Sequence, residues 1–251
     1  MDITPDSQIV FVLSAGPFGS ISISATIVST WIVMAVLVIG GRLATLGIGP
    51  AAPTSRWRIG VEYLVEMIRD QIRAIGGGDP ERYLPFVGTL FLFVLVSNIL
   101  GVVPGFQSPT GSLSTAVALA ICVLVAVPIY GIADNGLRGY LRHYITPTPY
   151  MAPFNIIGEI SRTIALAVRL YGNVMSGTVV VAILLSVMPF FFPVLMQLLG
   201  LLTGVIQAYI IAVLAMVYIA SASGQEPGAA EDRMPAARRG RRDTEPNQES
   251  R

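Results

Sequence analysis

Charge is scarce in this chain. Only 12% of its 251 residues are charged, against roughly 25% in a typical soluble domain. Lysine is missing altogether, so all 16 basic residues are arginine. A deficit of this size excludes an ordinary water-soluble fold. The formal net charge of +1 leaves no global field that would attract nucleic acid, so we predict no nucleic-acid partner.

Residues that bind metals or form disulfides are almost absent too. The single cysteine, Cys122, lies in an apolar run, which leaves no disulfide framework and no cysteine metal site. His143 is the only histidine, and this excludes most histidine-rich metal and proton-relay chemistry. No P-loop pattern for nucleotide phosphates occurs. We therefore predict no metal, no cofactor and no enzymatic activity for the chain by itself.

Long apolar runs are what the sequence does contain. It is 53% hydrophobic with a mean hydropathy of +0.69, and a helix crosses the hydrocarbon core with about 20 apolar residues. The acidic start, with Asp2 and Asp6, lacks the basic region of a cleavable signal peptide, so the first run is expected to remain as a span. We predict an all-α membrane protein with five spans, near residues 21–41, 84–103, 114–133, 153–187 and 195–222.

A different pattern lies between the first two spans. Over residues 57–75, apolar side chains recur at helical spacing and charged side chains fill the opposite side. This predicts an amphipathic helix on the membrane surface or on a partner, although an ordinary helix facing solvent would give the same pattern. Residues 224–251 are too polar to bury a core, so we expect a membrane domain over 1–223 and a disordered tail over 224–251.

The arginines also predict the orientation. They cluster between the first and second spans, between the third and fourth spans, and in the tail, whereas the N-terminal segment and the 105–113 loop have none. Because loops rich in arginine stay in the cytoplasm, the N-terminus is expected outside and the C-terminus inside. Five spans satisfy that arrangement.

The fourth span carries the most informative residues. Glu159, Arg162 and Arg169 lie in a segment that must otherwise cross lipid, where an arginine costs ~2.5–3.5 kcal/mol on insertion scales. Arg162, Arg169 and Ser176 are seven residues apart and share one helical face. Glu159 and Arg162 could simply pair with each other. Arg169 has no acid within one turn, so its partner is expected elsewhere, in this chain or another.

Several motifs resemble subunit a of the F-type ATP synthases. The most specific is Arg169-Leu-Tyr-Gly-Asn173, preceded by an acid at Glu159. Weaker motifs occur in the family's order, and together the resemblance covers about residues 60–223. They are Ser97-Asn-Ile-Leu-Gly-Val-Val-Pro104, Pro109-Thr110 with Leu113, Thr146-Pro-Thr-Pro149, Met151-Ala-Pro153 and Gln207-Ala-Tyr-Ile210.

The resemblance implies a mechanism, a location and partners. The family's subunit faces a ring of c subunits, each with a carboxylate at mid-membrane, so the last two helices are expected to be long and tilted along that ring. Arg169 would be the fixed charge between two half-channels that do not meet. Glu159 and Asn155 would line the half-channel on the cytoplasmic side. Arg162 and Ser176, which share the helical face of Arg169, are also expected to belong to the ion pathway. Asn173, Gln207 and Asn98 would line the outer half-channel. The expected surroundings are the bacterial inner membrane, its lipid, the c-ring, the peripheral-stalk b subunits and the other synthase subunits.

The sequence departs from the family at three positions. Thr178 and Gly200 stand where many bacterial relatives carry a titratable residue, and Thr163 replaces a common proline. The outer path then has no obvious acid or base. We predict proton transport, with sodium transport as the named alternative. A secondary transporter that uses the same buried charges is the main alternative, but the internal inverted repeats typical of transporters are not evident. A membrane scaffold that does not transport is the third alternative.

Overall fold

The computed structural model describes residues 9–14, 20–45, 56–76, 79–103, 106–145, 151–187 and 192–223. Within them the chain forms six α-helices, one short 3₁₀ turn and one two-stranded hairpin. The helices are α1 (Ala25–Thr45), α2 (Arg56–Gly76), α3 (Pro80–Leu100), α4 (Leu113–Ile145), α5 (Met151–Val187) and α6 (Phe192–Ala222), and the turn is η3 (Pro109–Gly111). The predicted tail 224–251 lies outside the described residues.

All five predicted spans are confirmed as helices long and apolar enough to cross a membrane. The first one begins at Ala25 rather than at position 21, so its predicted start was wrong. The reason is that Ser20–Ser24 forms strand β2, which pairs antiparallel with β1 (Ile9–Ser14). Serine and isoleucine alternate along β2, and that period of two is the strand signal that the prediction overlooked.

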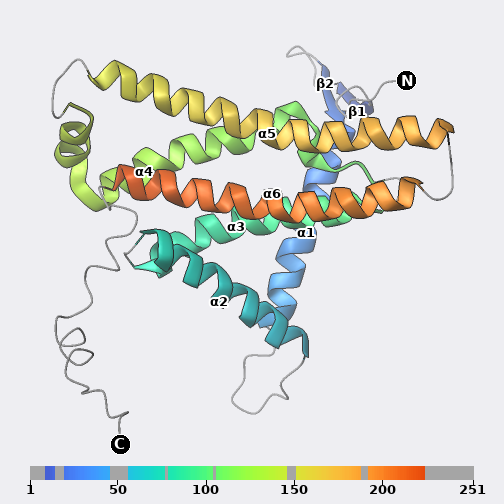
Figure 1. Ribbon diagram of the computed structural model, residues 1–251, viewed down its shortest axis with the longest axis horizontal. Coiled ribbons are helices and arrows are strands. Elements are labelled where there is room, and N and C mark those ends of the chain that lie inside the picture. Colours follow the sequence, from blue (N-terminus) through green and yellow to red (C-terminus); the bar gives the residue numbers. More distant parts are fainter. Residues whose placement is uncertain are drawn as a thin grey trace, which may run out of the picture.

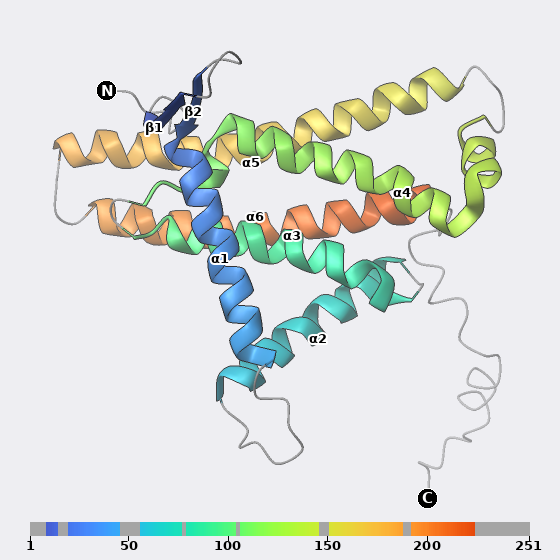
Figure 2. The same ribbon diagram turned by 180° about the vertical axis from the view of Figure 1, so that it is seen from behind.

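Four helices, α3 to α6, lie side by side, and α1 crosses them at a steep angle (Figures 1 and 2). α6 contacts α3, α4 and α5, so it lies at the centre of the bundle. With 37 residues, α5 is about 56 Å long, against a hydrocarbon core of about 30 Å. The 21 residues of α1 match that core in length. If α1 stands upright in the membrane, the helices α3 to α6 must be strongly tilted, because α1 crosses them at a steep angle. This tilt also fits the length of about 56 Å of α5 into a core of about 30 Å.

The core is formed by small and branched side chains between α3, α4 and α6. Val94, Ala116, Ala208, Ala215 and Ile219 are each at most 1% exposed. Alanines at the contacts let the helix backbones approach closely. In lipid the hydrophobic effect does not drive helices together, so they associate through such close packing. By contrast, Leu166, Ala167 and Leu170 are the only buried side chains among the described residues of α5. Most of α5 therefore faces lipid or another subunit.

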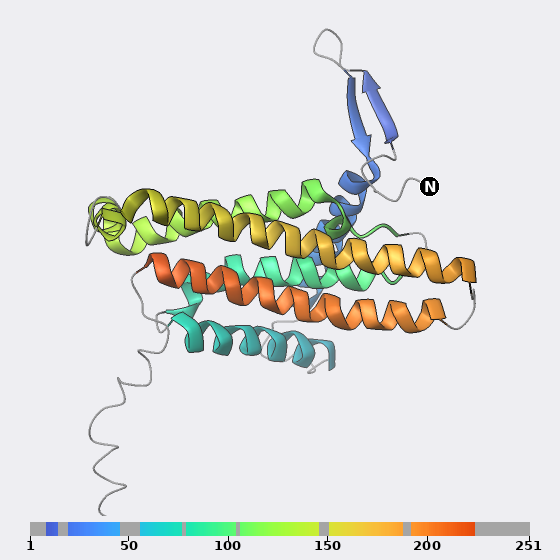
Figure 3. The same cartoon turned by 45° about the horizontal axis from the view of Figure 1, so that its top comes forward.

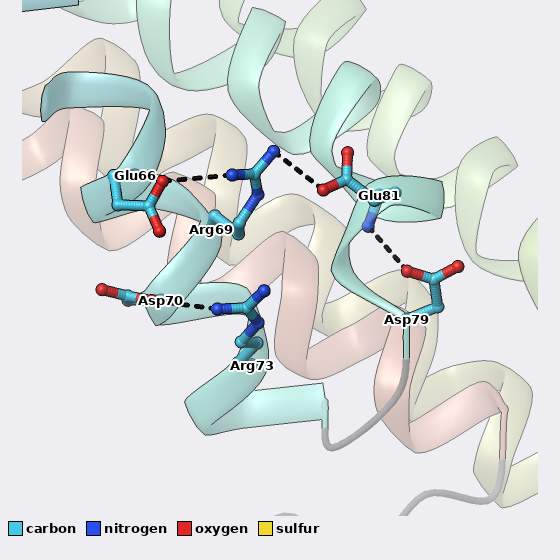
Figure 4. A network of polar contacts seen from close by, with 6 residues as sticks. All are labelled: Glu66, Arg69, Asp70, Arg73, Asp79 and Glu81. Carbon is cyan, nitrogen blue, oxygen red and sulfur yellow. Dashed lines mark hydrogen bonds and ion pairs between the residues drawn. The ribbon is translucent and has the colours of Figure 1, made fainter. Parts of the chain in front are cut away.

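The amphipathic helix α2 is also confirmed. Its apolar side does not face lipid alone, because Ile68 and Ile72 are buried against α3 and α6. At the corner between α2 and α3, Arg69 binds Glu66 at 3.1 Å and Glu81 at 2.8 Å (Figure 4). Asp79 caps α3 by accepting a hydrogen bond from the Glu81 backbone N–H. The corner thereby fixes the surface helix to the bundle. Figure 3 shows α2 lying alongside α6.

A break in α4 ends its straight part. Gly136 has φ 69° and ψ 163°, a conformation that only glycine adopts readily. Two helical parts of α4 meet at this kink, and the change of direction near the end of α4 is visible in Figure 1. One and a half turns earlier, Gly131 lies so close to the Tyr140 ring that a Cβ atom would be 2.8 Å from it. The turned segment therefore folds back on the end of α4.

Candidate functional site

The charged face of α5 is exposed. Arg162 and Arg169 are exposed and Glu159 is half-buried, while Leu166 and Leu170, between and beside them, are buried in the bundle. No acidic residue in the described part of the chain forms an ion pair with Arg169. An exposed cation on a helix that crosses lipid requires water or a partner carrying the opposite charge.

One pocket lies beside α5 toward its N-terminal end, and we call it the Glu159 pocket. Its volume is about 230 Å³, and α4, α5 and α6 form its walls. Three of the predicted residues line it together: Asn155, Glu159 and Arg162. The α4 wall is apolar, so the charged and amide groups of α5 provide most of its polarity. The other lining residues are Val123, Leu124, Val127, Phe154, Gly158, Thr163, Leu166, Tyr218, Ser221 and Ala222.

A second pocket lies beside α5 toward its C-terminal end, and we call it the Asn173 pocket. It measures about 260 Å³ and is enclosed by α3, the turn around η3, α5 and α6. Two predicted residues, Asn98 and Asn173, line it together with Thr178 and Gly200. Its polar side chains are all neutral, and no Asp, Glu, His, Lys, Arg or Tyr is among the lining residues that the structure describes. The further polar groups are Gln107, Ser108, Gln197 and Thr203.

Along α5 the two pockets do not meet. The lining of the Glu159 pocket ends at Leu166, and the lining of the Asn173 pocket begins at Asn173. These positions are seven residues apart, which is about 10 Å along a helix axis. Arg169 lies in this interval and lines neither pocket. The arrangement is thus two cavities, one with charged groups and one with neutral polar and apolar groups in its lining, separated along α5 by an interval that carries one exposed guanidinium.

Hydrogen bonds hold the wall of the Asn173 pocket in place. The Asn98 side chain is 9% exposed and donates to the Gly204 carbonyl of α6 at 3.0 Å. It accepts from the Thr110 hydroxyl at 3.2 Å. Ser108 donates to the Ser97 carbonyl at 3.1 Å. Asn98 therefore ties α3 to α6 and to η3, in addition to lining the pocket.

Two predicted residues lie outside both pockets. Gln207 is 6% exposed, and its Nε2 has no hydrogen-bond partner among the described residues. It lies one turn beyond Gly204, which does line the Asn173 pocket. Ser176 is exposed on the arginine face, where its hydroxyl donates to the Asn173 carbonyl at 3.1 Å. Their predicted place in the ion pathway stays a prediction.

Sequence reasoning missed two groups of residues. Tyr218 and Ser221 of α6 line the Glu159 pocket, and the guanidinium of Arg162 lies 5.6 Å from the centre of the Tyr218 ring. Asp134 joins three helices, because it accepts from Tyr83 at 2.6 Å and from Ser223 at 2.8 Å and pairs with Arg82. An acid at the end of a span, opposite a Tyr and a Ser in other spans, was too weak a signal to find alone.

Comparison with known proteins gives a consistent result. The model of the family described as ATP synthase A chain matches residues 25–220. The ATP synthase subunit a 1 of Crocosphaera subtropica is 55% identical over 221 residues, which cover 88% of this chain and 94% of the relative. The ATP synthase subunit a 2 of Acaryochloris marina is 56% identical over 89% of this chain and 93% of its own length. The ATP synthase subunit a of Albidiferax ferrireducens is 52% identical over 90% of this chain and 96% of its own length.

Proposed function

The chain belongs to the ATP synthase A chain family, and from that premise we propose that it translocates ions through the membrane sector of a rotary ATP synthase. The observation that carries this proposal is the barrier of about 10 Å on α5 between the two pockets. In the proposal the pockets are the aqueous half-channels and Arg169 keeps them apart. The chain has no catalytic role of its own, and ATP chemistry belongs to partner subunits.

The partner facing Arg169 is a ring of c subunits, each carrying a carboxylate at mid-membrane. A guanidinium stays protonated in this setting and stabilises a nearby carboxylate in its ionised form. A ring carboxylate therefore releases its ion when it reaches Arg169. It reloads from the other pocket before it returns to lipid, since a bare charge in lipid is prohibitive. The small residues Ala165 and Gly172, next to the arginine face, leave room for a ring helix to pass.

We place the chain in the bacterial inner membrane with its N-terminus outside. The Glu159 pocket then opens toward the cytoplasm and the Asn173 pocket toward the outside. The distribution of arginines supports this orientation. α1 has an exposed apolar side that includes Trp31 and Val38. In the proposal this side is available to lipid and to the peripheral-stalk b subunits.

The decisive variant is Arg169→Ala. We expect the complex to assemble while ATP-driven ion pumping is lost, because no charge remains to discharge the ring carboxylate. Pumping is measured in inverted membrane vesicles and normalised to the amount of subunit assembled with the ring. Arg73→Ala, which removes an exposed arginine of α2 that lines neither pocket, is the matched control. Normal pumping by Arg169→Ala would refute the mechanism. A chain that never co-purifies with a c-ring would favour a transporter or a scaffold.

We propose the proton as the transported ion, since water in the two pockets can deliver it. Sodium is the second candidate, because the Asn173 pocket is lined by neutral oxygen and nitrogen groups with no titratable side chain among the described residues. Such oxygens suit a hard cation that keeps part of its hydration. ATP-driven transport in proteoliposomes decides between the two. Acidification without sodium supports protons, whereas sodium uptake that persists with a protonophore supports sodium.

A further inference from the structure

One carboxylate joins three helices at one end of the bundle. Asp134 of α4 accepts hydrogen bonds through Oδ2 from the Ser223 hydroxyl at 2.8 Å and from the Tyr83 hydroxyl at 2.6 Å. Its other oxygen, Oδ1, pairs with Arg82 at 2.6 Å. Tyr83 and Arg82 belong to the first turn of α3, and Ser223 directly follows the last residue of α6. We call this cluster the Asp134 junction. Because the Asp134 side chain is only 13% exposed, water competes little for these bonds.

A second contact between α4 and α6 lies one turn before the junction on α4. A Cβ atom at Gly131 would be only 3.2 Å from the Ala222 carbonyl oxygen. The missing side chain at Gly131 thus lets α4 come close to the α6 backbone. Two positions on α4, Gly131 and Asp134, therefore meet two consecutive residues of the chain, Ala222 and Ser223. These contacts fix the distance between the two helices at this level.

The same two helices form two walls of the Glu159 pocket. α4 contributes Val123, Leu124 and Val127. α6 contributes three of its last five residues, which are Tyr218, Ser221 and Ala222. The third wall is α5, and no described residue of α3 lines the pocket. The Asp134 junction lies outside the pocket, but it ties one of the pocket's walls to another.

We propose that Asp134 is a positioning residue of the Glu159 pocket. By binding Ser223 it holds the end of α6 against α4, and it thereby fixes the opening between these helices through which water and ions enter. Its bonds to α3 hold the carboxylate itself in place. This inference rests on the proposed function, since it assumes that the pocket is the cytoplasmic half of the ion path. It gives a role to a carboxylate that lines neither pocket and lies in none of the motifs that carry the resemblance.

The junction offers a matched pair of substitutions. Ser223→Ala and Tyr83→Phe each remove one hydroxyl that donates to the same oxygen of Asp134. Ser223→Ala releases the end of α6, which lines the pocket, whereas Tyr83→Phe weakens the hold of α3, which does not. Ser223→Thr keeps a hydroxyl and is the rescue control. If the junction had only a structural role, the two removals would have the same effect on the pocket.

The first readout is the access of thiol reagents to the pocket. Gly158 of α5 lines the pocket, and a Cβ atom there would meet nothing within 4 Å. In the assembled complex with a Cys122→Ser background, Gly158→Cys is labelled from the cytoplasmic side by two membrane-impermeant reagents of equal charge and different size. A hydrogen bond to a charged group corresponds to about a tenfold change in an equilibrium. We expect Ser223→Ala to raise the labelling rate of the bulky reagent, relative to the small one, by up to about tenfold. Tyr83→Phe and Ser223→Thr should leave this ratio unchanged.

The second readout is pumping in inverted vesicles, where the cytoplasmic side faces the medium. External pH is varied at fixed sodium, and sodium chloride is varied at fixed pH. We expect Ser223→Ala to raise the half-saturating concentration of the transported cation, because the groups that line the pocket are held less firmly. The maximal rate per assembled complex should change little, and Tyr83→Phe should change neither quantity. Asp134→Asn removes the charge that strengthens the bond to Ser223, so it should shift both readouts in the same direction as Ser223→Ala.

Three outcomes overturn the inference. They are a ratio of labelling rates that Ser223→Ala leaves unchanged, an equal change in Tyr83→Phe, and a lower maximal rate with an unshifted half-saturation. The labelling experiment also separates this inference from the proposed function. If Gly158→Cys is not labelled at all in the otherwise native chain, the pocket is not an aqueous path, and the proposed function fails with it. If Gly158→Cys is labelled but the ratio does not respond to Ser223→Ala or Asp134→Asn, only the positioning role fails.

Discussion

Two glycines of α6 offer a matched pair of substitutions in one pocket. Gly200 and Gly204 are one turn apart, and both line the Asn173 pocket. A Cβ atom at Gly200 would meet nothing within 4 Å. A Cβ atom at Gly204 would lie 2.8 Å from the Asn98 Cβ and 2.9 Å from its Cγ. Gly204→Ala therefore requires a buried side chain and the α3 backbone to move, whereas Gly200→Ala does not.

The cost of Gly204→Ala can be worked out from these contacts. Overpacking a well-packed site costs typically about 1–3 kcal/mol. Displacing Asn98 also weakens its hydrogen bond to the Gly204 carbonyl, which contributes about 0.5–1.5 kcal/mol. Any gain in helix propensity is common to both variants and cancels in the comparison. We expect Gly204→Ala to be less stable than Gly200→Ala by about 1.5–4.5 kcal/mol.

The assay is the midpoint temperature at which the subunit is lost from the detergent-solubilised complex. In chains of this size each kcal/mol shifts an unfolding midpoint by about 2–4 °C, so several degrees should separate the two variants. Pumping should fall in Gly204→Ala, because Asn98 is part of the pocket wall. Equal midpoints and equal pumping in the two variants would show that the close approach of α3 and α6 at Gly204 does not exist.

Three further perturbations test other parts of the structure. Arg69→Ala should weaken the docking of α2 by about 1 kcal/mol, because Arg69 forms ion pairs with two acids. Arg73→Ala should have almost no effect, because its pair with Asp70 is exposed. Hydrogen exchange of the α2 backbone measures the difference between the two variants. Gly131→Ala should destabilise the complex by about 1–3 kcal/mol, measured by the same heating assay, because the new methyl group meets the Tyr140 ring. Glu159→Gln should slow pumping without uncoupling it, since water in the pocket can partly replace the carboxylate. An unchanged rate over a broad pH range would limit Glu159 to a structural role.

The helices were predictable because their signals are strong and local. Twenty apolar residues without charge can hardly be anything but a span, and the alternation of charged and apolar residues over α2 predicted its amphipathic helix. The hairpin was missed because β2 continues directly into the first apolar run. The serine–isoleucine alternation at positions 20–24 covers only five residues, and the long apolar run that follows it is the stronger signal.

The candidate site was only partly predictable. Arg169 could be predicted because a charged side chain in a membrane span is energetically costly and is therefore a functional candidate. Asn98 could be predicted because it lies in a motif. Tyr218 and Asp134 gave no such signal, since a tyrosine in an apolar helix and an acid at its end are common. Their roles depend on which helices lie next to each other. That information arises from packing between α4, α5 and α6, which a single sequence does not encode in any short window.

The barrier on α5 has an electrical consequence. In the proposed function the two pockets hold water and conduct, so a voltage across the membrane would fall mainly over the interval of about 10 Å around Arg169 rather than over the whole core of about 30 Å. The local field would then be about three times stronger than in the surrounding lipid. A carboxylate on a passing ring would feel most of the work of about 2.3 kcal/mol per charge per 100 mV within a displacement of a few residues. Adding water to that interval, for example by a polar residue at Val168, would spread the drop and weaken the torque before it opened any leak.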